Sequence, residues 1–293
     1  MRVTTLLPHP ALRPHVVRYL SLEAHFPVPF EQRVGPGGGG GAALGVLMGG
    51  TQRVAVPGGV LDTVPPAYLS GHLDRALPIE LAGPVRVFIV HFTATGAYVL
   101  LGLCVRELTN HAADLGAFAG PDLRTWAAAL AEAPDDAARA ASTDRVLLAR
   151  LLAASPKPHT TRVLETATAA AGLIAQAGGR IGVELLAKQL YTTSRTLLRH
   201  FEEVVGLPVQ AHARIVRFLA TRTYLDHHPD VPWSDVVFRF GYADQSHLIR
   251  DFQRYYGEPP SVFRAHQHEA RLITLVGRDP DTVHGGPVEP LHA

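Results

Sequence analysis

Apolar residues recur with the period of an α-helix at two places in the second half of the chain, residues 194–206 and 245–257. Within each stretch they fall at i, i+4 and i+7, which places them on one face of a helix. These positions are Leu197, Phe201 and Val204 in the first stretch and Leu248, Phe252 and Tyr255 in the second. Each stretch is therefore predicted to be an amphipathic helix with one buried face.

Both stretches carry start and end signals, and each follows a shorter predicted helix. Thr193 and Asp244 precede the first helical residues, where a side-chain oxygen can accept a backbone N–H. Gly206 and Gly257 follow the last apolar residues, a common way for a helix to end. The unit of short helix, turn and long helix occurs twice, and it predicts two helix-turn-helix motifs, whose second helix enters the major groove of DNA.

The remainder of the second half is also predicted to be helical, with segments at 161–177, 183–190, 208–227, 233–240 and 260–269. The helix at 208–227 connects the two units. At 1.5 Å per residue it spans about 30 Å, close to the ~34 Å between successive major-groove faces of DNA. The two long amphipathic helices are therefore expected to reach adjacent segments of the groove.

The first half alternates Gly and Pro with β-branched and aromatic residues, a composition typical of strands and turns. Strands are predicted at Gln52–Val56, Tyr68–Leu73 and Val85–Phe92, and helices at 96–108, 121–133 and 135–154. The glycine run at 37–41 is predicted to be a surface loop, because the Lys-Ser/Thr pair of a phosphate-binding loop does not follow it.

These elements predict an α+β protein. The expected divisions are an N-terminal mixed β and helical domain at 1–120, a helical segment and linker at 121–160, an all-α domain at 161–272 and a flexible tail at 273–293. The all-α domain would hold two helix-turn-helix subdomains joined by a long helix.

The composition is that of a globular protein, and it does not indicate a binding partner. The 293 residues are 47% hydrophobic and 18% charged, as in globular proteins. No apolar run is long enough to span a membrane, and a single cysteine, Cys104, excludes a disulfide within the chain and suits a cytoplasmic protein. Residues 160–272 hold 13 Lys and Arg against 11 Asp and Glu. Any binding of nucleic acid must therefore depend on where individual charges lie.

The second unit resembles a known signature. GYADQSHLIRDFQRYYGEPPSVFR (Gly241–Arg264) is similar to the motif of AraC/XylS-type transcriptional regulators, and Ser194–Phe201 with the flanking Leu186–Ala187 and Arg217–Phe218 resembles that family's first motif. The resemblance implies two helix-turn-helix subdomains joined by a long helix. It places the base-facing positions, which also lie opposite the apolar faces, at Ser194, Arg195, Leu198, Arg199, Gln245, Ser246, His247, Ile249 and Arg250.

Such residues suit base readout, since Arg can bind guanine and Gln can bind adenine through two hydrogen bonds. Contacts to phosphate are predicted from basic residues and helix N-termini, at Lys188, Thr193, Arg214, Arg217, Arg222, Asp244 and Arg254. Four features depart from the family pattern, among them Val237 in place of a small Ala and Glu202 with Glu203 after the first reading helix. Tyr191 stands in the first turn where Gly is usual, and Pro208 is displaced by one residue.

The expected partners are double-stranded promoter or operator DNA and RNA polymerase, with a small-molecule effector or a second copy of the chain at the N-terminal domain. That domain is similar to a sensory or dimerising module often fused to such DNA-binding domains, and its weak ligand candidates are His72 and His91. We expect an activator or repressor of bacterial transcription that is not an enzyme and needs no cofactor.

Two other classes of function stay open at this point. One is a small-molecule-binding cupin-like protein or enzyme with a helical interaction appendage, and the other is an adaptor that binds only protein. The 16 histidines do not follow the H-E-x-x-H spacing of a zinc site, so we expect no metal. Cys104 lies in an apolar segment that is expected to bury it.

Overall fold

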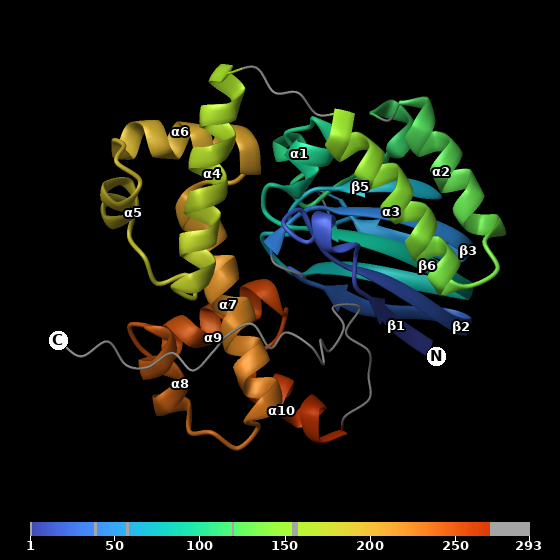
Figure 1. Ribbon diagram of the computed structural model, residues 1–293. Helices are drawn as coiled ribbons and strands as arrows, with labels where there is room; N and C mark the ends of the chain where they lie inside the picture. The colour runs from blue at the N-terminus through green and yellow to red at the C-terminus, as the bar shows by residue number, and fades with distance from the viewer. Residues whose placement is uncertain (1, 38–39, 57–58, 119, 154–157, 270–293) are drawn as a thin grey trace.

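The computed structural model describes residues 2–37, 40–56, 59–118, 120–153 and 158–269 (Figure 1). An antiparallel β-sheet with helices on one face is built from the first half of the chain, and the second half is helical. This confirms the predicted α+β class. Within the predicted helical segment and linker at 121–160, residues 154–157 lie outside the described residues, as does the predicted tail at 273–293, and helix α4 (Pro158–Gln176) begins at residue 158.

The strands are β1 (Arg2–Leu6), β2 (Val16–Val34), β3 (Ala43–Ala55), β4 (Leu61–Thr63), β5 (Ala67–Ser70), β6 (Leu77–Phe92) and β7 (Ala112–Asp114). Their order in the sheet is β1-β2-β6-β3-β5-β7, and β4 pairs with β3. The long strands β2 and β6 pair from Val16 opposite Phe92 to Val34 opposite Leu77. Each predicted strand overlaps an observed one, and β6 begins eight residues before the predicted strand at 85–92.

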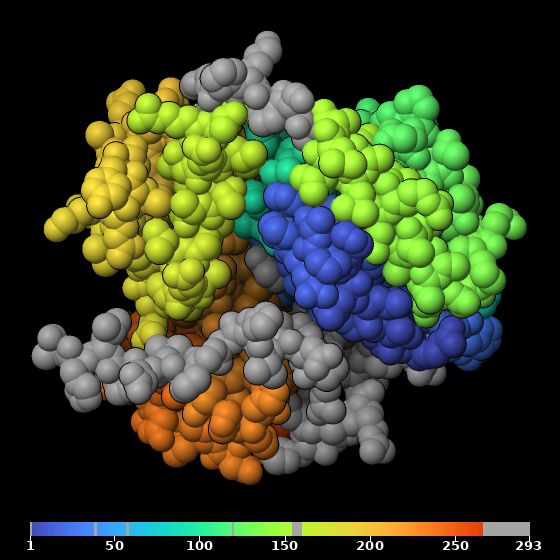
Figure 2. All heavy atoms as spheres, viewed as in Figure 1, coloured from blue at the N-terminus to red at the C-terminus, as the bar shows by residue number. Residues whose placement is uncertain are grey.

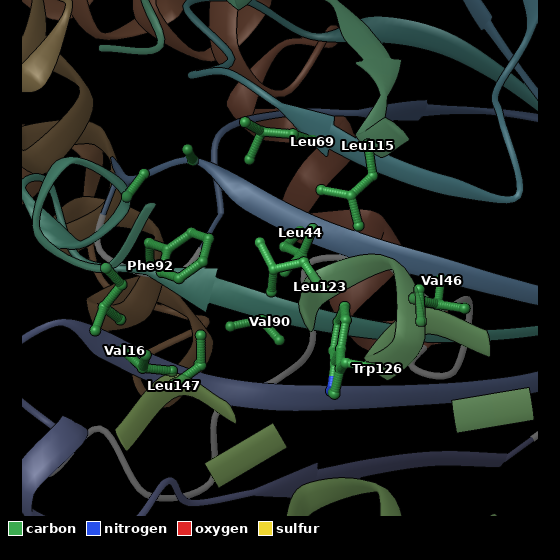
Figure 3. Packing of buried hydrophobic residues seen from close by; sticks show 14 of the residues in the cluster. Val16, Leu44, Val46, Leu69, Val90, Phe92, Leu115, Leu123, Trp126 and Leu147 are labelled. Atoms are coloured by element: carbon green, nitrogen blue, oxygen red, sulfur yellow. The ribbon is translucent and has the colours of Figure 1, made fainter. Parts of the chain in front are cut away.

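Two helices cover one face of the sheet, α2 (Pro121–Glu132) and α3 (Asp136–Ala153). Figure 3 shows Trp126 of α2 directed at the strands that carry Val46 and Val90. Its indole N–H also donates to the buried Thr143 hydroxyl of α3, at 3.1 Å. The helical segment predicted after residue 120 therefore shares its hydrophobic core with the sheet.

The helix predicted at 96–108 is shorter than expected. It is α1 (Gly96–Leu101), and it ends because Gly102 adopts a left-handed conformation with φ of 70°. A 3₁₀ turn, η3 (Arg106–Leu108), follows. Cys104 lies in the irregular segment between them and is exposed, so the expectation that a helix buries it was wrong. Figure 2 shows teal spheres of the N-terminal half between α3 and α4.

The helices of the second half are α4 (Pro158–Gln176), α5 (Val183–Gln189), α6 (Ser194–Val205), α7 (Val209–His227), α8 (Trp233–Phe240), α9 (Gln245–Tyr255) and α10 (Pro260–Glu269). Both α6 and α9 pack against α7 (Figure 1). Within the described part of the chain, no helix is long and apolar enough to cross a membrane.

Candidate nucleic-acid interface

The two long amphipathic helices, α6 and α9, begin at side-chain caps. The Thr193 hydroxyl accepts from the backbone N–H of Thr196 at 3.2 Å, and Asp244 Oδ1 accepts from that of His247 at 2.7 Å. Because the first N–H groups of a helix have no partner within it, each cap satisfies one of them. The caps define where the outward side chains of each helix start.

Fully buried side chains hold these two helices in place. Leu197 and Phe201 of α6 and Leu248 and Phe252 of α9 have no accessible surface. The Phe252 ring meets Phe218 of α7 edge to face, with ring centroids 5.2 Å apart. The opposite face of each helix therefore faces solvent, as the periodicity predicts.

The predicted base-reading side chains lie on these outward faces. Exposed members are Arg195, Leu198, Arg199, Gln245, Ser246 and Arg250, and half-buried members are Ser194, His247 and Ile249. Leu198 is exposed although it is large and apolar, with 39% of its surface accessible. Exposed cations and amides beside an apolar side chain match the groups that bases present in the major groove.

His247 differs from the other outward residues because it already has partners. Its Nε2 lies 2.9 Å from a terminal nitrogen of Arg217 on α7. The same guanidinium nitrogen donates to Asp251 at 2.9 Å, and the group stacks over the Tyr242 ring at 4.4 Å. Arg217 and Asp251 expose only 12% and 9% of their side chains. The predicted phosphate contact Arg217 is thus bound inside the domain in this arrangement.

The other predicted phosphate contacts occupy different environments. Lys188 and Arg214 are exposed, along with the capping residues Thr193 and Asp244, whereas Arg222 is half-buried. Burial lowers the pKa of the Arg222 guanidinium, and Asp226 and Tyr256 oppose that effect. Arg254 donates to the carboxylate of Asp74 in the N-terminal domain at 3.0 Å.

Tyr191 keeps the conformation that glycine would favour in the first turn. Its φ is 49°, in the left-handed region, and 97% of its surface is exposed. Pro208 directly precedes α7 and stands at its N-cap position. These two departures from the family pattern therefore leave the turn and the start of the connecting helix in place.

The N-terminal domain lies beside the outward face of α6. Arg106 forms an ion pair with Glu202 at 3.1 Å, and a wide open groove runs between this region and α6, with two predicted base-reading residues in its lining. The groove is lined by Cys104, Arg106, Glu107, Leu198, Arg199, Glu202 and Glu203. The carboxylates of Glu107, Glu202 and Glu203 would repel DNA phosphates on this side of α6.

Of the two weak ligand candidates, only His91 lines a cavity within the sheet domain. His72 lies elsewhere, buried between the domains, with its ring nitrogens facing the carbonyl oxygens of Gly40 and Val205. Sequence reasoning missed Asp74 and Asn110, which connect the cavity wall to the helical half. No local pattern marks either residue, because both act through partners distant in the sequence.

Within the described residues, no cluster of three or more His, Cys, Asp or Glu could hold a metal ion.

Comparisons with known proteins match both halves of the chain. Residues 186–266 match the family model of a helix-turn-helix domain, and residues 4–114 match that of a domain of unknown function. No curated protein matches the sequence.

Among solved structures, ToxT from Vibrio cholerae O395 aligns with 84% of this chain and 97% of its own, at 8% identity and a TM-score of 0.46. ToxT bound to (E)-4-(8-methylnaphthalen-1-yl)but-3-enoic acid aligns with 91% and 100%, at 8% identity and a TM-score of 0.45. The AraC-like transcriptional activator CuxR aligns with 74% and 86%, at 15% identity and a TM-score of 0.27.

Proposed function

We propose that this chain is a DNA-binding transcriptional regulator that reads two adjacent segments of the major groove through α6 and α9. The starting point is the AraC-type helix-turn-helix domain at residues 186–266. The observation that carries the proposal is the pair of capped helices that each bury one face and expose the other. The connecting helix α7 has 19 residues and is about 29 Å long, close to one turn of DNA.

Base readout is assigned to the outward residues of the two helices. Arg195 and Arg250 are the strongest candidates, because both are exposed and each can bind guanine through two hydrogen bonds. Ser194, Leu198, Arg199, Gln245, Ser246, His247 and Ile249 complete the proposed set. Phosphate contacts would come from Lys188, Arg214 and the helix N-termini at Thr193 and Asp244. Arg254, Arg222 and Arg217 would join them only after leaving their present surroundings.

The N-terminal sheet domain is proposed to sense a small molecule or to mediate self-association. Either event would change occupancy of the operator or contact with RNA polymerase. ToxT has been solved with a small organic acid bound, and a ligand is proposed here independently, from the cavity beside His91.

Binding to promoter fragments tests this function. Bound fragments are first selected from the genome of the source organism, and their affinity is then measured for wild type, Arg195→Ala and Arg250→Ala. Each substitution is expected to cost about 1–3 kcal/mol of binding free energy and to relax preference at one position of the site. Arg145→Ala, at an exposed position on α3, is the matched control and should bind as wild type does.

A salt titration separates phosphate binding from other association. The logarithm of the affinity should fall linearly with the logarithm of salt concentration. A slope near zero, or full affinity in both arginine variants, would contradict the proposed function.

A further inference from the structure

A cavity lies within the N-terminal domain, on the face of the sheet opposite α2 and α3. Its volume is about 120 Å³. Along β3, β5 and β6 successive side chains alternate between the two faces: Leu44, Leu69 and Val90 pack in the core under the helices, and their neighbours Ala43, Tyr68 and His91 line the cavity. The cavity is therefore a product of the strand pattern and is separate from the core.

The cavity wall is mainly apolar and carries no formal charge from acidic or strongly basic side chains. Among the described residues that line it there is no Asp, Glu, Lys or Arg. Burial, together with the nearby Arg18 guanidinium, lowers the pKa of His91 to about 3, so this ring is neutral at physiological pH. A charged ligand would lose its hydration here without an opposite charge on any residue that lines the cavity, and that cost is large. The nearby Arg18 guanidinium is already hydrogen-bonded to His91.

Two residues that line this apolar cavity, His91 and Tyr68, carry hydrogen-bond donors. Arg18 donates to Nδ1 of His91 at 3.3 Å, so the proton of the neutral ring resides on Nε2. Burial raises the pKa of Tyr68 to about 12, and the Gln52 side chain opposes that shift by hydrogen bonding. Tyr68 lines the cavity, and its protonated phenol carries an O–H that can donate to an oxygen of a bound ligand.

Size limits the ligand further. An engineered cavity of about 150 Å³ in another protein holds one benzene molecule, so 120 Å³ limits the ligand to at most one small ring. We propose that this cavity binds a small uncharged ring compound carrying a carbonyl or hydroxyl oxygen, and that its occupancy is transmitted through Asn110 to both α6 and α9. The first part concerns the sensor alone, and the second rests on the proposed DNA-binding function.

Asn110 connects the cavity to the neighbouring loop between β5 and β6. It lines the cavity, is only 8% exposed and holds a left-handed backbone with φ of 59°. Its side chain makes two hydrogen bonds to Asp74, donating to the carboxylate at 2.7 Å and accepting from the backbone N–H at 3.0 Å. Its own backbone N–H donates to the carbonyl oxygen of His72 at 2.8 Å.

The same loop contacts the C-terminal ends of both amphipathic helices. His72 hydrogen-bonds the carbonyl oxygen of Val205, the last residue of α6. Asp74 accepts from Arg254 of α9 through its carboxylate at 3.0 Å and its backbone carbonyl at 2.8 Å. Ala76 adds a backbone hydrogen bond to the carbonyl oxygen of Arg254 at 2.7 Å.

One loop therefore fixes α6 and α9 relative to each other, and its residues Gly71 and Leu73 form part of the cavity wall. A ligand that displaces this wall or Asn110 must change contacts at both helices. By linkage, an effect of the ligand on DNA affinity equals the effect of DNA on ligand affinity.

The first experiment measures ligand binding by calorimetry on the full chain without DNA. Phenol and cyclohexanone are the neutral probes, and benzoate and cyclohexylamine are charged probes of similar size. We expect the neutral probes to bind at least tenfold more tightly than the charged ones. Tyr68→Phe should weaken cyclohexanone binding by about tenfold, as expected for one lost hydrogen bond. Ala43→Leu, which fills the cavity, should abolish binding while the chain keeps its circular dichroism spectrum.

Tighter binding of benzoate, or unchanged cyclohexanone binding in folded Ala43→Leu, would overturn the ligand assignment. Absence of binding by every probe would overturn it as well. None of these outcomes depends on DNA.

The second experiment measures DNA affinity with and without saturating cyclohexanone. In wild type we expect a change of at least fivefold. In Asp74→Ala, which leaves the cavity lining intact, probe affinity should stay within twofold of wild type and the effect on DNA affinity should fall below twofold. Arg75→Ala, an exposed neighbour in the same loop, is the matched control and should keep the full effect.

A full effect in Asp74→Ala would exclude transmission through this loop. If the chain binds probe but no DNA fragment, the proposed function fails and the ligand assignment stands. If it binds DNA but no probe, the reverse holds.

Discussion

Arg217 of α7 donates to Asp251 of α9 across 2.9 Å, inside a part of the domain where both side chains are almost fully buried. This pair attaches the second amphipathic helix to the connecting helix. It also holds His247, whose Nε2 lies 2.9 Å from the same guanidinium nitrogen. The orientation of one predicted base-reading residue thus depends on an ion pair behind it.

Removal of Asp251 should strongly destabilise the domain. Asp251→Ala would leave the buried Arg217 guanidinium without its counter-charge, and we expect a loss of about 3–5 kcal/mol in the free energy of unfolding. Urea denaturation followed by circular dichroism measures it. Glu203→Ala, at an exposed position on α6, should change stability by less than about 0.5 kcal/mol. Equal effects of the two substitutions would contradict a structural role for the pair.

Tyr191→Gly should stabilise the chain. A non-glycine residue in the left-handed region costs roughly 1–2 kcal/mol, and a nearly fully exposed tyrosine contributes little packing in return. Glycine has a greater entropic cost on folding, of about 0.5–1 kcal/mol, so the expected net gain is up to about 1 kcal/mol. Thermal unfolding would register it as a higher Tm. Tyr191→Ala, which removes the ring and keeps the strain, should give no such rise.

Loss of the caps should destabilise the two amphipathic helices to a similar extent. Thr193→Ala and Asp244→Ala each remove one side-chain acceptor from the first turn, at an expected cost of about 1 kcal/mol. Thr193→Ser and Asp244→Asn keep an acceptor and should recover most of the loss. Amide hydrogen exchange at Thr196 and His247 would locate the effect, and unchanged protection there in the alanine variants would refute it.

The buried His212 should make stability depend on pH. Burial, with a smaller contribution from His72, lowers the pKa of His212 to about 3 from the ordinary value of 6.5. Between these two pKa values, His212 is protonated in the unfolded chain and neutral in the folded chain. The free energy of unfolding therefore falls as pH drops from about 6.5 toward 3. The loss from this group is roughly 2 kcal/mol at pH 5.

His212→Leu tests this dependence. Leucine cannot titrate, and it also replaces a ring whose Nδ1 has no hydrogen-bond partner among the described residues. The decrease in unfolding free energy between pH 7 and pH 5 should be smaller in this variant than in wild type. The same decrease in both proteins would show that His212 does not contribute.

Local signals explain why the helical half was predictable. The helix at Ser194–Val205 was predicted with both ends correct because Thr193 caps it and Gly206, with φ of 81°, ends it. These signals lie within a few residues of the structure they determine. The outward faces of α6 and α9 could be predicted for the same reason, and the DNA contacts assigned to them stay predictions.

The N-terminal half depends on contacts between distant segments. Strand β2 is 19 residues long and pairs with β6 across two register irregularities, so no single sequence period runs through it. The bonds from Asn110 to Asp74 and from Asp74 to Arg254 cross 36 and 180 positions. Sequence patterns within either segment cannot indicate such partners, which is why the loop between β5 and β6 was missed.

The loop between β5 and β6 also affects the order in which the chain can fold during synthesis. Its hydrogen bonds to Val205 and Arg254 join residues 133 and 180 positions apart. Domains generally fold from the N-terminus as the chain emerges from the ribosome, so the sheet and its cavity can form while these partners are still missing. If the proposed ligand binds this cavity, it can do so before the helix-turn-helix units exist, because the contacts to Val205 and Arg254 require residues that are synthesised later.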